Sequence, residues 1–188
     1  MHQQEIIHSH GSLKLSSYPL RSIIELKKIK AMEKTLASSP FITLKENDGY
    51  FYCESPPFVT IVAHRGSSIL LVKQKRPFFN KPIWGLPGGR MEKGEKPQQA
   101  AKREFLEETG YHAKKIVVAK TITPSTSLLK AEGYMCIAYG LTKKYKTAPD
   151  AAEIINSSWV NWIDALPLIH DSVSLAAILV WRQRRQRE

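Results

Sequence analysis

The sequence predicts an α/β fold in which helices flank a mixed sheet. Short apolar runs typical of strands alternate with a few segments of helical periodicity, and no internal repeat is present. Residues 59–63 and 69–73 are almost entirely apolar, which is typical of strands buried on both faces. The 188 residues are enough for one domain with an appended segment. We expect an extension over residues 1–40 and the main domain over residues 41–188.

The extension is predicted to contain an amphipathic helix from Ser22 to about residue 37. Ser22 and Glu25 have the spacing of a capping box. Apolar side chains then recur at helical intervals, at Ile23, Leu26, Ile29, Met32 and Leu36. We expect this helix to pack on the domain or on a second subunit. The alternative is a helix lying on a membrane surface, which its lysines would favour.

The main domain begins with strands. Residues 41–44 and 50–53 flank Asn47-Asp48-Gly49, which predicts a hairpin. A turn at Gly66-Ser67 separates the two apolar strands. Further strands are expected over residues 115–119, 134–141 and 158–163, and a closing helix over residues 172–185.

A short helix is predicted between Pro97, which suits a first helical turn, and Gly110, which suits the residue after the last turn. Glu104, Glu107 and Glu108 share one face of this helix. Two of them lie in the last turn, where the helix dipole disfavours anions.

A divalent cation would relieve both the dipole and the mutual repulsion of these carboxylates. Ala100 lies one turn earlier, and its small side chain is expected to leave room for an ion and its waters. The alternative is a solvated glutamate-rich face, with Arg103 and the lysines as ion-pair partners.

The spacing around this helix resembles the Nudix box of the Nudix hydrolases. Gly89 is followed after five residues by Glu95, and after seven more by the run REFLEETGY from Arg103 to Tyr111. Every fixed position of the pattern is filled, although Tyr111 stands where the family usually has an aliphatic residue. The resemblance implies an α/β/α sandwich with the box as a loop-helix-loop at one edge, and residues 41–188 as the Nudix domain. It also implies Mg²⁺-dependent hydrolysis of a nucleoside diphosphate linked to another group, with Mn²⁺ as the alternative metal.

The resemblance also implies roles for residues of the box. Glu104 and Glu108 would hold one or two ions, Glu107 would be a further ligand and part of the catalytic set, and the backbone carbonyl of Gly88 would complete the metal site. Arg103 is expected to contribute to catalysis by orienting the glutamates through ion pairs rather than by touching substrate. Glu95 is expected to tie the loop to Arg103.

A general base is expected near the attacked phosphorus. In the ADP-ribose branch of the family this glutamate comes from a late loop, and Glu153, shortly before the predicted strand at Ser158, has the corresponding place. Glu132, in the turn before residue 134, is the rival. For either residue the alternative is an exposed loop acid without a role.

Outside the box the chain resembles the ADP-ribose and ADP-sugar pyrophosphatase branch in three stretches, which are residues 74–77, 84–89 and 171–177. Arg76 is expected to bind a substrate phosphate, unless it is an ordinary exposed arginine at a strand end. Three departures from the branch are present, and one of them is the run Thr123-Pro124-Ser125-Thr126-Ser127, which stands in place of the small-residue turn that usually follows a serine-proline pair. Gly85 stands where many members carry a metal-binding glutamate, and the N-terminal helix replaces a strand-rich segment through which several relatives dimerise.

Three aromatic side chains, Tyr50, Phe51 and Phe78, could stack on a nucleotide base, although aromatic residues at strand spacing are more often part of the core. ADP-ribose or another nucleotide sugar is therefore the expected substrate. Other Nudix substrates remain as alternatives: oxidised nucleoside triphosphates, dinucleotide polyphosphates or capped RNA. A non-catalytic nucleotide- or RNA-binding module of the same fold is a further alternative.

The composition indicates the partners. The net charge is +11 and the isoelectric point is near 9.7, which suits polyanions such as nucleotides. A nucleic-acid partner is not favoured, because no RNA-binding motif accompanies the basic C-terminus, and a homodimer stays open. Cys53 and Cys136 are expected to be buried free thiols of a reducing compartment. No signal peptide is evident and the longest apolar run, residues 175–181, is too short to span a bilayer, so we expect a cytoplasmic protein without membrane contacts.

Overall fold

The computed structural model describes residues 33–76, 79–145 and 154–187. Its strands, in chain order, are β1 Lys34–Ser38, β2 Thr43–Asn47, β3 Tyr50–Glu54, β4 Phe58–Arg65, β5 Ser68–Gln74, β6 Ile83–Gly85, β7 Gly88–Arg90, β8 Tyr111–Ile122, β9 Leu129–Lys130, β10 Gly133–Lys143 and β11 Ile154–Asn161. Its helices are α2 Pro97–Thr109, α3 Trp162–Ala165, the 3₁₀ turn η1 Leu166–Leu168 and α4 Ser172–Arg185.

The central sheet is mixed. Its strand order is β11-β5-β4-β10-β8, with β6 paired to β5 and β7 paired to β4. The pair β4–β10 is parallel and the other pairs are antiparallel. Both central strands, β4 and β5, are buried over most of their length, as their unbroken apolar sequences predict. The expected α/β class is confirmed.

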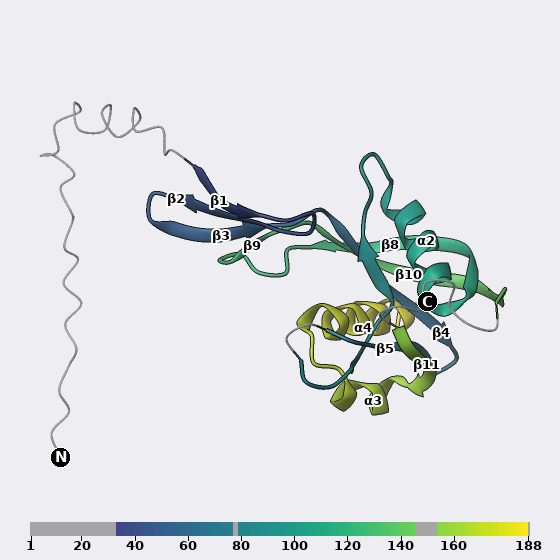
Figure 1. Ribbon diagram of the computed structural model, residues 1–188. Coiled ribbons are helices and arrows are strands. Elements are labelled where there is room, and N and C mark those ends of the chain that lie inside the picture. Colours follow the sequence, from purple (N-terminus) through teal and green to yellow (C-terminus); the bar gives the residue numbers. More distant parts are fainter. Residues whose placement is uncertain (1–32, 77–78, 146–153, 188) are drawn as a thin grey trace, which may run out of the picture.

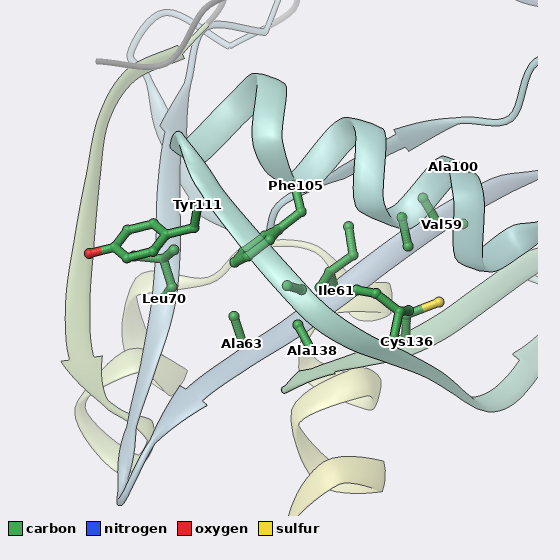
Figure 2. Close-up of a cluster of buried hydrophobic side chains, with 12 residues drawn as sticks. Val59, Ile61, Ala63, Leu70, Ala100, Phe105, Tyr111, Cys136 and Ala138 are labelled. Atoms are coloured by element: carbon green, nitrogen blue, oxygen red, sulfur yellow. The ribbon is translucent and has the colours of Figure 1, made fainter. Parts of the chain in front are cut away.

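Helices cover the two faces of this sheet, as Figure 1 shows. Ala100 and Phe105 of α2 pack in one apolar cluster with Val59 and Ile61 of β4 (Figure 2). The cluster on the opposite face contains Trp181 of α4, Val62 of β4 and Leu71 of β5. Strand β4 therefore alternates its side chains between two cores, and the expected α/β/α sandwich is confirmed.

A second sheet, with strand order β1-β2-β3-β9, projects from the sandwich (Figure 1). Its β2–β3 hairpin confirms the predicted turn. Asp48 and Gly49 have φ angles of 52° and 78°, the left-handed pair that a two-residue hairpin loop requires.

The end of the predicted N-terminal helix is wrong. Residues 22–32 lie outside the described residues, but residues 34–38 form β1 and pair antiparallel with β2. Lys34 lies opposite Glu46, with 3.7 Å between their charged atoms, and Ser38 shares a 3.0 Å hydrogen bond with Thr43. Pairing with a neighbouring strand overrides the apolar periodicity here, because β-structure depends on cross-strand context more than on local pattern. Residues 34–38 are therefore strand rather than helix, and the rest of the predicted helix lies outside the described residues.

The last third of the chain follows the prediction except at β11, which begins at Ile154, four residues earlier than expected, and at α3 and η1, which the sequence did not predict. Strand β11 ends at Asn161, two residues earlier than expected, because the Asn161 side chain accepts a 3.1 Å hydrogen bond from the Ile163 amide and caps α3. The closing helix α4 has the predicted bounds. Its N-cap is Asp171, which accepts a 2.7 Å hydrogen bond from the Ser174 amide.

The two cysteines are free thiols, as predicted. Cys136 is buried, and burial raises the pKa of its thiol to about 12. Cys53 is only half-buried, so the expectation of a buried thiol is wrong there. Within the described ranges, no helix is both long enough and apolar enough to pass through a membrane.

Candidate active site

The glutamate-bearing helix has the predicted ends. Pro97 begins α2, and the Lys96 amide donates a 2.9 Å hydrogen bond to the side chain of Gln99, which is half of a capping box. At the other end Gly110 has a left-handed φ of 70°, and its amide donates to the Leu106 carbonyl at 2.8 Å. These ends place the acidic last turn of α2 beside the loop that contains Gly88 and Gly89.

Arg103 is the electrostatic centre of the site. Its Nε and Nη2 donate to the two oxygens of Glu95 at 3.1 and 2.9 Å, which is a bidentate ion pair. Its Nη1 donates to Glu104 at 2.8 Å and to Glu107 at 3.2 Å. Nη2 also donates to the carbonyl of Arg90 at 3.0 Å. The expected tie between Glu95 and Arg103 is present, and Arg103 contacts two of the three helix glutamates.

Glu95 and Glu104 respond to this arrangement in opposite ways. The guanidinium of Arg103 lowers the pKa of Glu95 from its ordinary value of 4.5. Burial raises the pKa of Glu104 above the same value, and it outweighs the opposing contact with Arg103. Glu104 is therefore a carboxylate whose charge the protein alone leaves incompletely compensated.

Glu108 is held from two other elements. The Gly88 amide donates to its Oε2 at 2.8 Å, and Nε2 of Gln74 donates to its Oε1 at 2.7 Å. Gln74 is 5% exposed and lies at the end of β5. Nη2 of Arg76 donates in turn to Oε1 of Gln74 at 2.6 Å. Glu108 is thus connected to Arg76 through one amide.

A cavity of about 940 Å³ lies over these groups. The predicted site residues among its lining are Arg76, Gly88, Arg103, Glu104 and Glu108. Glu107 does not line the cavity; its carboxylate instead accepts from Arg103. The cavity therefore combines two acids of the helix with cationic side chains from two elements.

The expected role of Ala100 in making room for an ion is wrong. Ala100 is fully buried and packs against Val59 and Ile61 in the core between α2 and the sheet (Figure 2). A residue one turn before Glu104 is on the core side because α2 lies flat on the sheet, and α2 reaches the cavity through Arg103, Glu104 and Glu108.

The two candidate bases have different outcomes. Glu153 lies outside the described residues; the residue after it, Ile154, begins β11 and pairs with Gln74. Glu132 is exposed and lines a second hollow of about 670 Å³, and its carboxylate accepts a 2.6 Å hydrogen bond from the Tyr134 hydroxyl. The second hollow shares Pro40, Ser55 and Pro56 with the first.

Two of the three aromatic side chains considered for base stacking, Tyr50 and Phe51, are not core residues. Tyr50 and Phe51 are 53% and 56% exposed on β3 of the projecting sheet, and Phe78 lies outside the described residues. The expectation that Tyr50 and Phe51 belong to the core is therefore wrong.

The oxygen donors of the site fit a hard divalent cation. Mg²⁺ prefers carboxylate and carbonyl oxygens, and Glu104, Glu108 and Gly88 supply these at one wall of the cavity. Burial raises the pKa of Glu104, and a bound cation would offset the cost of this buried charge. Over the part of the chain that the structure describes, no three acidic, histidine or cysteine side chains already form a ready-made cation cage. Water and substrate oxygens would complete the coordination, as is usual for Mg²⁺.

Three cavity residues were missed as site residues by the sequence reasoning: Gln74, Asp171 and Ser174. In the sequence, Gln74 stands out only as the first residue of a stretch that resembles the ADP-ribose and ADP-sugar pyrophosphatase branch. Ser174 is 4% exposed, and its hydroxyl accepts a 3.2 Å hydrogen bond from the Leu86 amide, which ties α4 to the glycine-rich loop. The sequence around Asp171 is typical of a helix start. No local pattern predicts that the Ser174 hydroxyl contacts a loop 88 residues away in the chain.

Comparisons with known proteins agree with this geometry. The NUDIX domain family matches residues 55–179. The ADP-ribose pyrophosphatase of Bacillus subtilis (strain 168) is 34% identical over 102 residues, which are 54% of this chain and 55% of that protein. The "Putative 8-oxo-dGTP diphosphatase" of the same organism is 53% identical over 53 residues, which are 28% of this chain and 33% of that protein. The chain thus aligns with between one third and about half of the length of these relatives.

The fold has counterparts among solved structures. A crystal structure of an ADP compounds hydrolase superposes with a TM-score of 0.69 at 19% identity, covering 82% of this chain and 91% of the other. This likeness concerns the fold alone. The family match spans most of the sandwich and includes the helix, the loop and the cavity described above, and the chain belongs to the Nudix hydrolase family.

Proposed function

We propose that this protein hydrolyses the diphosphate linkage of a nucleoside diphosphate derivative, with ADP-ribose or another nucleotide sugar as substrate and Mg²⁺ as cofactor. The observation that carries the proposal is the cavity in which Glu104 and Glu108 lie with Arg76. Such a cavity offers oxygen ligands for a cation beside a guanidinium for a phosphate. The relative named ADP-ribose pyrophosphatase supports the choice of substrate.

Glu104, Glu108 and the Gly88 carbonyl would hold Mg²⁺, or Mn²⁺ as the alternative, and Glu107 would be a further acid of the catalytic set. When bound, the cation would supply charge neutralisation of the diphosphate and a lowered pKa for a coordinated water. Arg103 would keep Glu104 in place through its 2.8 Å hydrogen bond and would not touch substrate.

Arg76 would bind a substrate phosphate. It is exposed and lines the cavity, and its Nη2 donates a 2.6 Å hydrogen bond to Gln74, which holds the guanidinium at this wall. The geometry of a guanidinium matches phosphate oxygens better than a lysine ammonium would. This role predicts a higher KM, with less effect on kcat, when Arg76 is changed to alanine.

The general base in this proposal is Glu153. The residue after it, Ile154, pairs with Gln74, which lines the cavity. Glu132 is the alternative base, but it belongs to the second hollow rather than to the cavity with the box glutamates. Glu153→Gln and Glu132→Gln separate the two, because only the change of the true base removes the acidic limb of the pH–rate profile, in which the rate rises as the base loses its proton.

A second candidate function is hydrolysis of a nucleoside triphosphate. Its specific support is the 53% identity over 53 residues with the relative named "Putative 8-oxo-dGTP diphosphatase". The same box chemistry serves both substrates, so the choice depends on the parts of the cavity outside the box.

The test is product formation from a panel of diphosphate compounds, with Mg²⁺ and with chelator. The panel contains ADP-ribose, other nucleotide sugars, nucleoside triphosphates, dinucleotide polyphosphates and capped RNA. We expect metal-dependent release of AMP from ADP-ribose well above all other turnover. Turnover confined to triphosphates would overturn the substrate, and turnover that survives the chelator would overturn the cofactor.

The proposal extends to assembly and location. Apolar side chains on the projecting sheet are exposed, among them Leu36 at 49% and Phe51 at 56%, which favours a homodimer through this sheet. Sedimentation equilibrium tests this: Phe51→Ser should weaken the dimer, and a wild-type monomer at all concentrations would exclude it. Free thiols at Cys53 and Cys136 favour the reducing cytoplasm. The catalytic domain of this proposal is residues 41–188.

A further inference from the structure

The buried side-chain amide of Gln74 lies between Glu108 and Arg76. The proposed function gives these two charged residues separate roles. Gln74 donates through Nε2 to Glu108 at 2.7 Å and accepts through Oε1 from Arg76 at 2.6 Å. Its side chain is 5% exposed. Glu108 is a proposed cation ligand and Arg76 a proposed phosphate contact, so the amide connects a cation site with an anion site.

The chemistry of the two neighbours determines how the amide is oriented. A glutamine side chain offers N–H donors at one end and a carbonyl acceptor at the other. Glu108 can only accept when ionised, and Arg76 can only donate. The reverse orientation would place the amide oxygen against a carboxylate and the NH₂ against a guanidinium. Each charged neighbour therefore supports the orientation that the other requires.

The backbone of Gln74 is also held on both sides. In the sheet it pairs with Ile83 of β6 and with Ile154 of β11. The amide therefore starts from a rigid position, which lets it restrict the carboxylate of Glu108 rather than follow it. Glu108 keeps a second hold, the 2.8 Å hydrogen bond from the Gly88 amide.

We propose that Gln74 is a positioning residue that couples cation binding at Glu108 to the anion-binding guanidinium of Arg76. The inference rests on the proposed function for the roles of those two residues. Polarisation along a chain of hydrogen bonds strengthens each bond in it, so the Arg76 contact tightens the hold of Gln74 on Glu108. Outer contacts of metal-binding carboxylates commonly change metal affinity or activity by about 10- to 100-fold.

The test is calorimetric titration of the substrate-free protein with Mg²⁺ alone. Gln74→Met removes both hydrogen bonds without adding charge, and Gln74→Asn keeps an amide that is too short to reach both partners. We expect both variants to raise the Mg²⁺ dissociation constant about tenfold or more. Gln98→Met, the same change at an exposed position of α2, should leave it unchanged.

A double-mutant cycle tests the coupling itself. Arg76→Ala is made in the wild type and in the Gln74→Met variant, and the change it causes in the Mg²⁺ dissociation constant is compared. A difference of about threefold or more between the two backgrounds supports the coupling. Equal changes in both backgrounds would overturn it, as would Mg²⁺ binding by Gln74→Asn at the wild-type level. Thermal unfolding of each variant identifies any that fails to fold; if Gln74→Met does so, the cycle is run on Gln74→Asn.

The Mg²⁺ titrations test the positioning role of Gln74 separately from the proposed function, because they are made without substrate. If no member of the diphosphate panel is hydrolysed but Mg²⁺ binding depends on Gln74, the proposed function fails and the positioning role stands. If ADP-ribose is hydrolysed and Gln74→Asn has the wild-type kcat, KM and Mg²⁺ requirement, the proposed function stands and the positioning role fails.

Discussion

Gly89 lies directly against the carboxylate of Glu104. A Cβ added at Gly89 would come within 2.5 Å of Cδ and of both oxygens of that carboxylate. Gly89→Ala should therefore displace Glu104 from the cavity. Because a misplacement of about 1 Å in an active site can cost roughly a hundredfold in rate, we expect a loss of about that size. Steady-state kinetics at saturating Mg²⁺ checks this.

Gly85→Ala is the comparison for this experiment. A Cβ added at Gly85 would meet Asp171 at 3.4 Å and Ser174 at 3.6 Å, which are ordinary contacts. This variant should lose far less activity than Gly89→Ala, even though both positions line the same cavity. Equal losses would show that the crowding of Glu104 is not what makes the glycine necessary.

Glu108→Gln should abolish most turnover while leaving the protein folded. The neutral amide is a poor cation ligand, and it presents an NH₂ group to one of the two donors that Glu108 now accepts from, Gln74 and Gly88. We expect kcat to fall by at least roughly a hundredfold and the free energy of unfolding by about 1 kcal/mol. Kinetics and urea unfolding measure the two quantities.

Glu107→Gln is the matched control for Glu108. Its carboxylate does not line the cavity and accepts a 3.2 Å hydrogen bond from Arg103. The loss of activity should be smaller than for Glu108→Gln. Near-wild-type activity in Glu108→Gln would refute the assignment of Glu108 as a metal ligand.

Arg103→Lys should destabilise the protein as well as inactivate it. Lysine cannot reproduce the bidentate contact with Glu95 and at the same time reach Glu104. We expect a loss of about 2 kcal/mol in the free energy of unfolding, since hydrogen bonds to charged groups are worth about 1.5–3 kcal/mol. Arg184→Lys is the control, because Arg184 is exposed and makes one 3.4 Å contact with the Ala119 carbonyl; it should cost less than about 0.5 kcal/mol.

The pH dependence of stability should carry the signature of Glu95. Its pKa is lowered in the folded protein, so it contributes stability above the ordinary value of 4.5, and this is lost as the pH falls through the lower folded pKa. Glu95→Gln should therefore be less stable than the wild type at neutral pH, and the difference should shrink below pH 4.5. Urea unfolding at several pH values between neutral and strongly acidic measures it.

Glu104 should behave in the opposite sense. Its pKa is raised by burial, so its ionisation opposes folding as the pH rises from 4.5 through the folded pKa. In metal-free protein, Glu104→Gln should gain stability relative to the wild type across that rise. Parallel curves for Glu95→Gln and Glu104→Gln would contradict both assignments.

Much of the fold could be predicted because its signals are local. The hairpin at Asp48-Gly49, the ends of α2 and the bounds of α4 each depend on a few neighbouring residues. The box spacing also identified Arg103 and its partner Glu95, since both lie on one loop and helix.

The parts that failed depend on contacts distant in sequence. Ala100 and Glu104 share a helical face in the sequence, yet one is fully buried against Ile61 and the other reaches the cavity. How a helix is seated on a sheet determines this, and spacing alone does not contain it. The same holds for Gln74, whose role at the cavity depends on Glu108, 34 residues later.

Strand β1 is a further case. Its apolar spacing continues a helical pattern, but residues 34–38 are all exposed and owe their conformation to pairing with β2. Each such failure concerns tertiary context that overrides local preference.

The pairing of β7 with β4 affects which parts of the protein can open locally. Gly88 pairs with Thr60 and Gly89 with Val59, and the Ile61 amide donates to the Pro87 carbonyl at 2.8 Å, so the glycine-rich loop is joined to β4, a buried strand of the central sheet. Opening this loop requires the core to open with it, which places the loop in the slowest class of amide hydrogen exchange. Local unfolding that leaves the sandwich intact therefore also leaves the glycine-rich wall of the cavity intact. Any motion that admits substrate is then expected in the other walls of the cavity.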